Sequence, residues 1–153
     1  MRYFNASIAN LTHRLRKFDE VLKESLEEII IELQPEIVSL VAEEQLYKEG
    51  INGKGVSIMS YAPYAQSTIK KKIRKGQPTN RVTLRDTGDF HKSLFVVFDE
   101  GGFYIATENK KLVYLEPKYG EEILRLTDEN LSYLLNTYVK PRLAERLKAK
   151  LDL

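Results

Sequence analysis

Residues 84–94 read Leu84-Arg85-Asp86-Thr87-Gly88-Asp89-Phe90-His91-Lys92-Ser93-Leu94, and they follow the most basic segment of the chain. Asp86 and Thr87 have short polar side chains that bond nearby backbone N–H groups, and Gly88 adopts positive φ without a steric cost. Residues 93–98 then carry the β-branched and aromatic side chains that strands prefer. We therefore expect a structural turn at Asp86, Thr87 and Gly88 that ends a helical half and begins the strands.

Composition excludes several classes of protein. Of 153 residues, 42% are hydrophobic and 30% are charged, which is typical of one folded domain. No apolar run approaches the ~20 residues that span a bilayer, and the first residues lack the architecture of a signal peptide. The chain has no cysteine and only two histidines, which excludes disulfides, thiol catalysis and a multi-histidine metal centre. We therefore expect synthesis in the cytoplasm, no membrane association, and no metal or cofactor.

The net charge of +2 conceals three blocks of alternating sign. Residues 1–50 contain six Lys/Arg and ten Asp/Glu, residues 51–85 contain eight and none, and residues 86–153 contain ten and twelve. Blocks of opposite sign suit a protein that meets other surfaces in a fixed register. A solvated helix face beside a basic loop gives the same pattern.

Residues 10–50 are predicted to be helical. Asn10 or Thr12 is a candidate N-cap, Pro35 is expected to break or kink the helix, and Gly50 is a candidate C-cap. Apolar side chains recur every three or four residues, at Leu11, Leu15, Phe18, Leu22, Leu26, Ile29 and Leu33. This stripe predicts packing on the protein's own sheet, with a coiled-coil seam between subunits as the alternative.

Residues 51–81 are predicted to form a basic loop followed by a short helix from Pro63 to Lys75, which Gly76 ends. The cations of this segment are Lys70, Lys71, Lys72, Arg74, Lys75 and Arg81. One interpretation is contact with nucleic-acid phosphates, and the other is a solvated helix end whose cations suit the helix dipole. No recognised nucleic-acid motif accompanies the segment.

Residues 82–117 are predicted to form a small antiparallel meander of about three strands, at 93–98, 103–107 and 112–115. Thr127 is expected to cap a C-terminal helix over 127–151 that Pro141 kinks or restarts. The sequence therefore predicts one α+β domain over 1–153, with long N-terminal helices and a C-terminal helix packed on the meander.

Three catalytic interpretations were considered. Asp86-Thr87-Gly88 matches the tripeptide of retroviral-type aspartic proteases, in which two carboxylates of a dimer share a proton. That tripeptide normally ends a hydrophobic strand in a mostly β chain, whereas Arg85 precedes it here. His91 lies beside Asp89 and Ser93, but no nucleophile elbow is present, so His91 is predicted to be an exposed residue at the start of a strand. No carboxylate pair stands out as a glycosidase site. We therefore expect no enzymatic activity, with a dimeric aspartic protease as a minor alternative.

Short motifs follow one another between the predicted terminal helices. They are Tyr61-Ala62-Pro63-Tyr64-Ala65, Thr68-Ile69-Lys70-Lys71-Lys72, the stretch 84–94, and Leu124-Arg125-Leu126-Thr127-Asp128-Glu129. In this order they resemble the tail-completion and virion-morphogenesis proteins of tailed bacteriophages, which are small head–tail joining proteins. The resemblance covers roughly residues 11–150. At residues 114–120 the chain lacks the histidine and alanine of the family's turn.

The resemblance implies a structural virion protein of the phage neck or tail terminus, made in the host bacterium. Such a protein would assemble as a homo-oligomeric ring and contact the connector or portal side of the head and a tail protein. The basic segment would then face packaged DNA or an acidic ring surface. A DNA-binding accessory domain is the alternative function.

Overall fold

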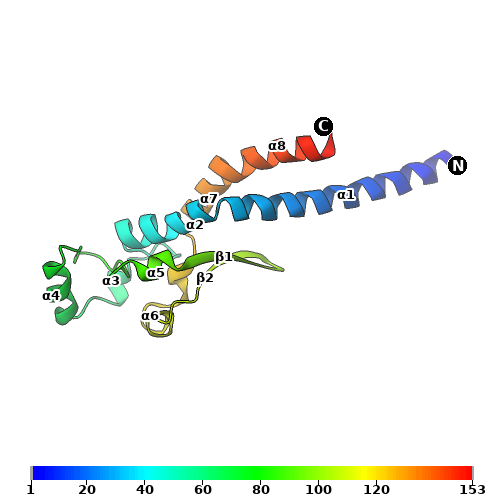
Figure 1. Cartoon of the computed structure of the whole chain (residues 1–153). Helices are drawn as coiled ribbons and strands as arrows, with labels where there is room; N and C mark the ends of the chain where they lie inside the picture. The colour runs from blue at the N-terminus through cyan, green and yellow to red at the C-terminus, as the bar shows by residue number, and fades with distance from the viewer. Residues whose placement is uncertain (1, 153) are drawn as a thin grey trace. The chain divides into compact units, whose positions relative to one another are not determined.

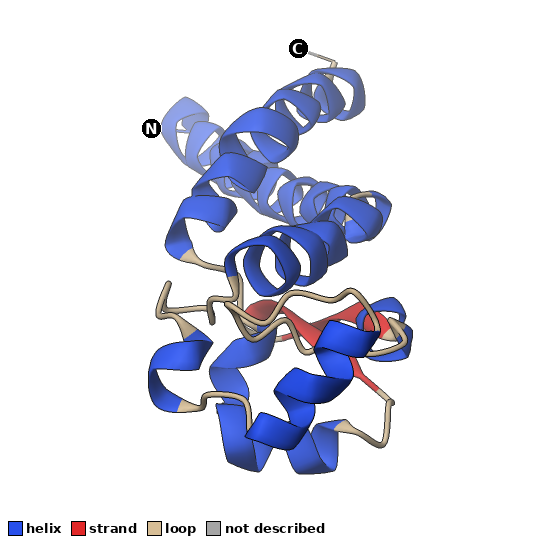
Figure 2. Cartoon of the chain, turned by 90° about the vertical axis from the view of Figure 1, so that its left-hand side faces the viewer, coloured by secondary structure: helices blue, strands red, loops and turns tan. Residues whose placement is uncertain are grey.

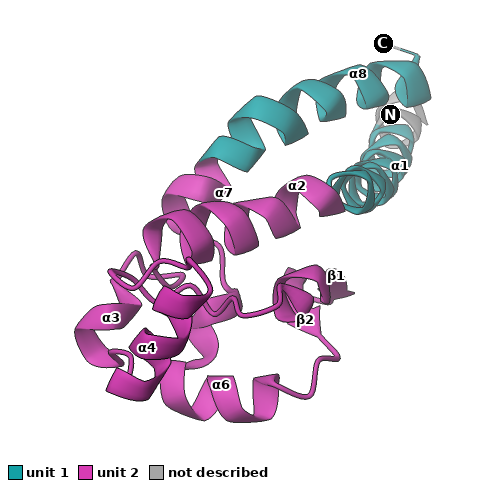
Figure 3. Cartoon of the chain, turned by 60° about the vertical axis from the view of Figure 1, so that its left-hand side comes forward, with its two compact units in different colours: residues 1–33, 133–153 teal, residues 34–132 magenta. Residues whose placement is uncertain are grey.

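The computed structural model describes residues 2–152, with the side chains of residues 8–152. The chain forms two compact units, coloured separately in Figure 3. We call residues 1–33 and 133–153 the helical unit, and residues 34–132 the mixed unit. Helices predominate, and a two-stranded antiparallel sheet is the only sheet in the described part of the chain (Figure 2). This architecture confirms the predicted α+β class.

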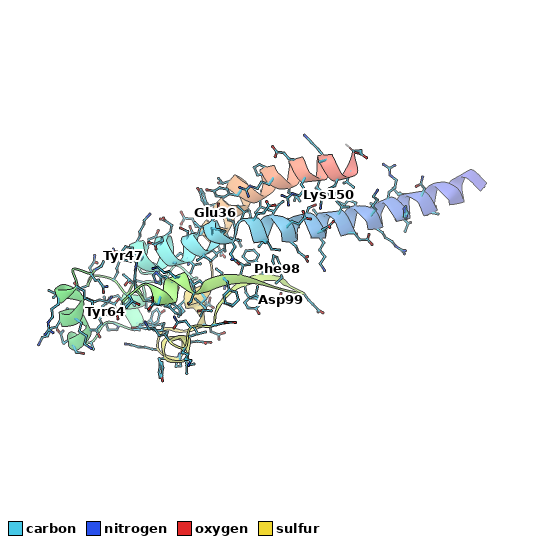
Figure 4. All side chains as sticks on the ribbon, viewed as in Figure 1. Glu36, Tyr47, Tyr64, Phe98, Asp99 and Lys150 are labelled. Atoms are coloured by element: carbon cyan, nitrogen blue, oxygen red, sulfur yellow. The ribbon has the colours of Figure 1, made fainter. Side chains whose placement is uncertain are left out.

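The helical unit consists of a long helix and a shorter antiparallel one (Figure 1). The long helix is α1 (Arg2–Glu32), and the shorter one is α8 (Lys140–Leu151), which continues from the π-helical η3 (Leu135–Val139). Ion pairs join Arg142 to Glu32, Arg146 to Glu28 and Lys150 to Glu24, so α8 runs opposite to α1. Lys150, labelled in Figure 4, projects from α8 toward α1.

The mixed unit surrounds one β-hairpin with short helices. β1 (Leu94–Asp99) pairs with β2 (Gly102–Thr107), from Leu94 opposite Thr107 to Asp99 opposite Gly102. The remaining elements are α2 (Gln34–Ser39), the π-helical η1 (Leu40–Glu49), α3 (Ile58–Tyr61), α4 (Gln66–Arg74), α5 (Asp89–Lys92), α6 (Leu112–Tyr119), the 3-10 helix η2 (Glu121–Leu124) and α7 (Asp128–Leu134), which leads into the helical unit. Its fully buried apolar residues are Ile37, Val41, Leu46, Ile58, Val82 and Ile123.

The predicted third strand is wrong. Residues 112–115 begin α6, so the strands occupy only 94–107 of the predicted meander. Asn109 explains the difference, because its side-chain oxygen accepts a hydrogen bond from Lys111 N at 3.0 Å. Its carbonyl oxygen accepts another from Leu112 N. A short polar side chain that bonds the backbone in this way starts a helical turn in competition with a strand.

Several helix boundaries follow the predicted signals. A turn at Leu33 separates α1 from α2, and Pro35 is the second residue of α2. Gly50 ends η1 with φ +67°. Thr127 caps α7, because its Oγ1 accepts a hydrogen bond from Asn130 N at 3.1 Å. Pro141 lies in the first turn of α8, where the helix resumes after η3.

Two predicted helix starts are wrong. α1 begins at Arg2, before Asn10 and Thr12, and Thr12 Oγ1 instead donates to the carbonyl of Ile8 at 3.0 Å. α4 begins at Gln66 and not at Pro63, because Ala65 is still extended, with ψ 152°. The predicted end at Gly76 is confirmed by its φ of +65°.

The apolar stripe of α1 is buried only at its C-terminal end. Ile29 and Leu33 are fully buried, whereas Leu11 and Leu15 are both 57% exposed. The stripe is therefore not buried along its whole length. The reason is length: α1 has 31 residues and α8 has 12, which at 1.5 Å per residue gives about 46 Å and about 18 Å. α8 cannot cover the N-terminal half of α1.

Candidate functional site

The basic helix α4 turns one of its lysines into the interior. Lys72 is only 7% exposed, and its Nζ donates to the carbonyl of Arg85 at 2.9 Å. The same ammonium lies 5.0 Å from the ring centre of Tyr64, which is labelled in Figure 4. Gln77 and Thr83 provide further oxygen acceptors at 3.3 and 3.5 Å. Lys72 is thus a structural residue that fixes residues 83–85, and it is not available to a partner.

Two more of the predicted cations are also used within the chain. Lys75 forms an ion pair with Asp86, and the Lys75 ammonium holds the pKa of that carboxyl below its ordinary value. Arg81 donates through Nε to the carbonyl of Tyr47 at 2.7 Å. An ionised, exposed Asp86 beside a lysine does not favour the shared proton of an aspartic-protease dyad.

The exposed remainder of the basic segment is small. Lys70, Lys71 and Arg74 are exposed, and none has an ion-pair partner within the described chain. Ile73 stands beside them with 64% of its surface exposed. We call these four residues the α4 surface. The six cations predicted to form one patch therefore divide into three that bond other residues of the chain and three that have no such partner in the described residues.

The turn at residues 86–88 forms as predicted at two of its three positions. Gly88 has φ +90°, and Thr87 Oγ1 accepts a hydrogen bond from Asp89 N at 3.3 Å. The prediction that Asp86 bonds a nearby backbone N–H is wrong, because its carboxylate pairs with Lys75. The turn leads into α5 before β1 begins, so one helical turn separates it from the sheet.

His91 is buried, contrary to the prediction of an exposed residue at the start of a strand. It lies in α5 with 4% of its surface exposed, and its Nε2–H donates to the carbonyl of Thr83 at 2.9 Å. Burial lowers the pKa of this imidazole. Its Nδ1 has no hydrogen-bond partner in the described structure. The neutral ring is therefore a core group that bridges α5 to the segment preceding the turn.

Gln45 is a buried polar residue that the sequence interpretation did not single out. It is fully buried, and its Nε2 donates to the carbonyl of Arg125 at 2.9 Å. Its Oε1 accepts from Thr127 N and from Asn130 Nδ2, both at 2.9 Å. The sequence did contain a signal for this burial. Gln45 lies four residues after Val41, so both fall on the same face of η1, and an apolar side chain is expected at that position.

Two hollows lie on the mixed unit. The larger, of about 680 Å³, lies against Gly101–Ile105 of the hairpin and residues 121–131, and we call it the hairpin groove. The smaller, of about 270 Å³, includes Tyr64, Lys72, Arg85 and Lys111. Within the described residues, no group of histidine, aspartate or glutamate side chains could hold a metal ion. Among residues 2–152, no helix is both long and apolar enough to cross a bilayer.

Comparisons with known proteins give no relative. No protein-family model matches the chain, and neither a curated protein nor a solved structure matches it significantly. The candidate surfaces are therefore judged on their own chemistry: an exposed apolar helix face, the small basic α4 surface, and an open hollow beside the hairpin.

Proposed function

We propose that the protein is a structural virion subunit of the phage neck or tail terminus, which assembles as a ring between the head connector and the tail. The observation that carries the proposal is the exposed apolar face of α1. Ile8, Leu11, Leu15 and Phe18 follow helical spacing, and 37–57% of the surface of each is exposed. The motif order along residues 61–129 supports the phage assignment by resemblance.

An apolar face of this kind suits contact with a neighbouring subunit. Single exposed apolar residues are normal, but a contiguous apolar stripe marks an interaction surface. Covering it removes apolar area from water, at roughly 25 cal/mol for each Å². The same stripe raised the alternative of an intersubunit seam in the sequence. Because only the C-terminal residues of the stripe are buried, a seam between subunits is a better interpretation of the stripe than packing within the chain.

The first experiment is the solution mass by light scattering at several ionic strengths, with and without duplex DNA. The wild type should form a discrete closed oligomer, and Leu15→Glu should convert it to a monomer because a carboxylate then lies in the apolar seam. Lys17→Glu, on the polar side of α1, is the matched control and should assemble normally. A wild-type protein that has the same monomeric mass as Leu15→Glu would contradict the proposal.

A DNA-binding accessory domain is the second candidate, favoured by the exposed cations Lys70, Lys71 and Arg74. Three phosphate contacts predict that log K falls with log salt with a slope of about −2.7 for duplex DNA. Lys70→Ala should make this slope shallower by about one. Binding that does not change between low and high salt would exclude this class.

A further inference from the structure

The hairpin groove combines an apolar floor with acidic side chains. Its lining includes Phe103, Ile105, Leu126 and Leu131, and its volume of about 680 Å³ falls in the range of about 300–1,000 Å³ typical of ligand pockets. The groove lies beside residues 102–105 of β2. In the described chain, β2 pairs with β1 and with no other strand. The groove can therefore accept apolar side chains from outside.

The acids of this groove are Glu121, Glu122 and Asp128. Glu121 is exposed and has no ion-pair partner within residues 8–152, and the Asp128 side chain is 94% exposed, with only Arg125 near it at 3.8 Å. Glu122 is already paired with Lys54 at 3.2 Å. Arg125 also lines the groove and lies 3.5 Å from Glu122. Glu121 is thus the carboxylate that has no cation beside it in the described residues, and Asp128 shares only a long, exposed ion pair.

The α4 surface has the opposite character. Ile73 projects an apolar side chain, 64% exposed, and Lys70, Lys71 and Arg74 around it lack partners in the described chain. An apolar knob among cations complements an apolar groove with acids at its edge. No residue of α4 lines the groove of its own chain, and Figure 1 shows α4 and the hairpin tip at opposite ends of the mixed unit.

We infer that the occupant of the hairpin groove is α4 of a second copy of this chain, with Ile73 on the apolar floor and Lys70 or Arg74 beside Glu121 and Asp128. This inference rests on the proposed ring, for which it names a second contact besides the apolar face of α1. The two surfaces differ, so the contact is head-to-tail, and a head-to-tail contact repeats from copy to copy and gives a ring when its rotation closes. A self-complementary dimer would instead use one surface twice.

The absence of native cysteine allows a direct test by cross-linking. Ile73→Cys and Tyr104→Cys are made as separate single variants, because Tyr104 lines the groove and is 49% exposed. One variant carries a mass tag, and the two are mixed and treated with a short bismaleimide. A 73–104 heterodimer is expected, and a chain with both cysteines should give a ladder of higher oligomers.

Two controls make the result specific. Val113→Cys replaces Tyr104→Cys in the first control, since Val113 is 71% exposed but lies outside the groove. In the second, Glu121→Lys in the groove partner should reduce the 73–104 yield, and Lys70→Glu in the other partner should restore it. Equal yields for the groove and the Val113 pair would overturn the inference. A ring with no 73–104 product places the contact elsewhere and spares the proposed function, whereas no oligomer and no product overturns both.

Discussion

The two units use polar side chains in opposite ways. In the mixed unit the amide of Gln45 is fully buried and makes hydrogen bonds to three residues of the 125–130 segment. In the helical unit the interhelical polar contacts are ion pairs at the surface, such as Arg146 Nη2 to Glu32 at 2.8 Å. Buried hydrogen bonds are expensive to break, because their partners are left without water. Surface ion pairs contribute little and are screened by salt.

This contrast indicates that the mixed unit is stabilised by its own interior, whereas the helical unit leaves the N-terminal part of the α1 stripe exposed. The exposed stripe of α1 contributes nothing to the isolated chain until another surface covers it. Four measurements test this contrast between the two units, and the variant with the greatest predicted change comes first.

Gln45→Leu should have the largest effect. It leaves the N–H of Thr127 and the amide of Asn130 without their buried acceptor, at a cost of about 3 kcal/mol in the free energy of unfolding. Urea denaturation measures the loss. Glu49→Ala, an exposed change at the end of the same helix, is the control and should shift the midpoint very little. Equal midpoints for the two variants would show that the mixed unit does not depend on this buried amide.

Gly88→Val should cost about 2 kcal/mol in the free energy of unfolding. The cause is the backbone, because φ is +90° and an added Cβ would meet nothing closer than Arg85 Nε at 3.7 Å. Gly101→Ala is the control, since its φ lies outside the left-handed region. A Gly88→Val variant as stable as the wild type in thermal unfolding would remove the turn from the features that stabilise the mixed unit.

His91 should make the mixed unit less stable in mild acid. Burial lowers its pKa in the folded state and outweighs the hydrogen bond to Thr83, which acts in the opposite direction. The positive charges of Arg85 and Lys72 also lower the pKa, and the charge of Glu43 raises it. The unfolded chain therefore binds the proton more readily, and stability is lost as pH falls below about 6.5. In the His91→Gln variant, the free energy of unfolding should depend less on pH between about pH 5 and 7. His13→Gln, a change at an exposed site, is the control and should leave the pH dependence of stability as it is in the wild type. The same pH dependence in His91→Gln would show that His91 is not its source.

Arg146→Ala should have the smallest effect, and the effect should depend on salt. Arg146 contacts Glu28 at 3.0 Å and Glu32 at 2.8 Å, and these bonds hold the pKa of the guanidinium above its ordinary value. At ~1 M salt the screening length is about 3 Å, so variant and wild type should unfold at the same temperature. Lys148→Ala, an exposed change on α8, provides the baseline. A large loss that persists in high salt would mean that α8 is held by packing.

Local signals in the sequence predicted the parts of the fold that depend on local chemistry. The break at Pro35, the cap at Thr127 and the positive φ of Gly88 each follow from one residue and its neighbours. The predicted strand at residues 112–115 failed for the same reason, because the side chain of Asn109 starts a helical turn that apolar periodicity did not take into account.

Burial of polar side chains was the part that sequence did not predict. In the sequence Lys72 is one of three consecutive lysines, and only the approach of residues 83–85 places it inside. His91 is buried because its ring bonds Thr83, eight residues earlier. The exposure of Leu11 and Leu15 depends on how far α8 reaches, which no pattern within α1 records.

The side chain of Gln34 has a consequence for growth of the sheet. Its Oε1 accepts the hydrogen bond of Val96 N at 3.0 Å, and α2 packs against β1. The outer edge of β1 is therefore blocked to another strand at Val96, while β2 has no outer neighbouring strand among the described residues. A fibril that grows by strand addition needs two open edges on every molecule. A molecule with one open edge can accept a single extra strand and then stops, which limits amyloid-like polymerisation.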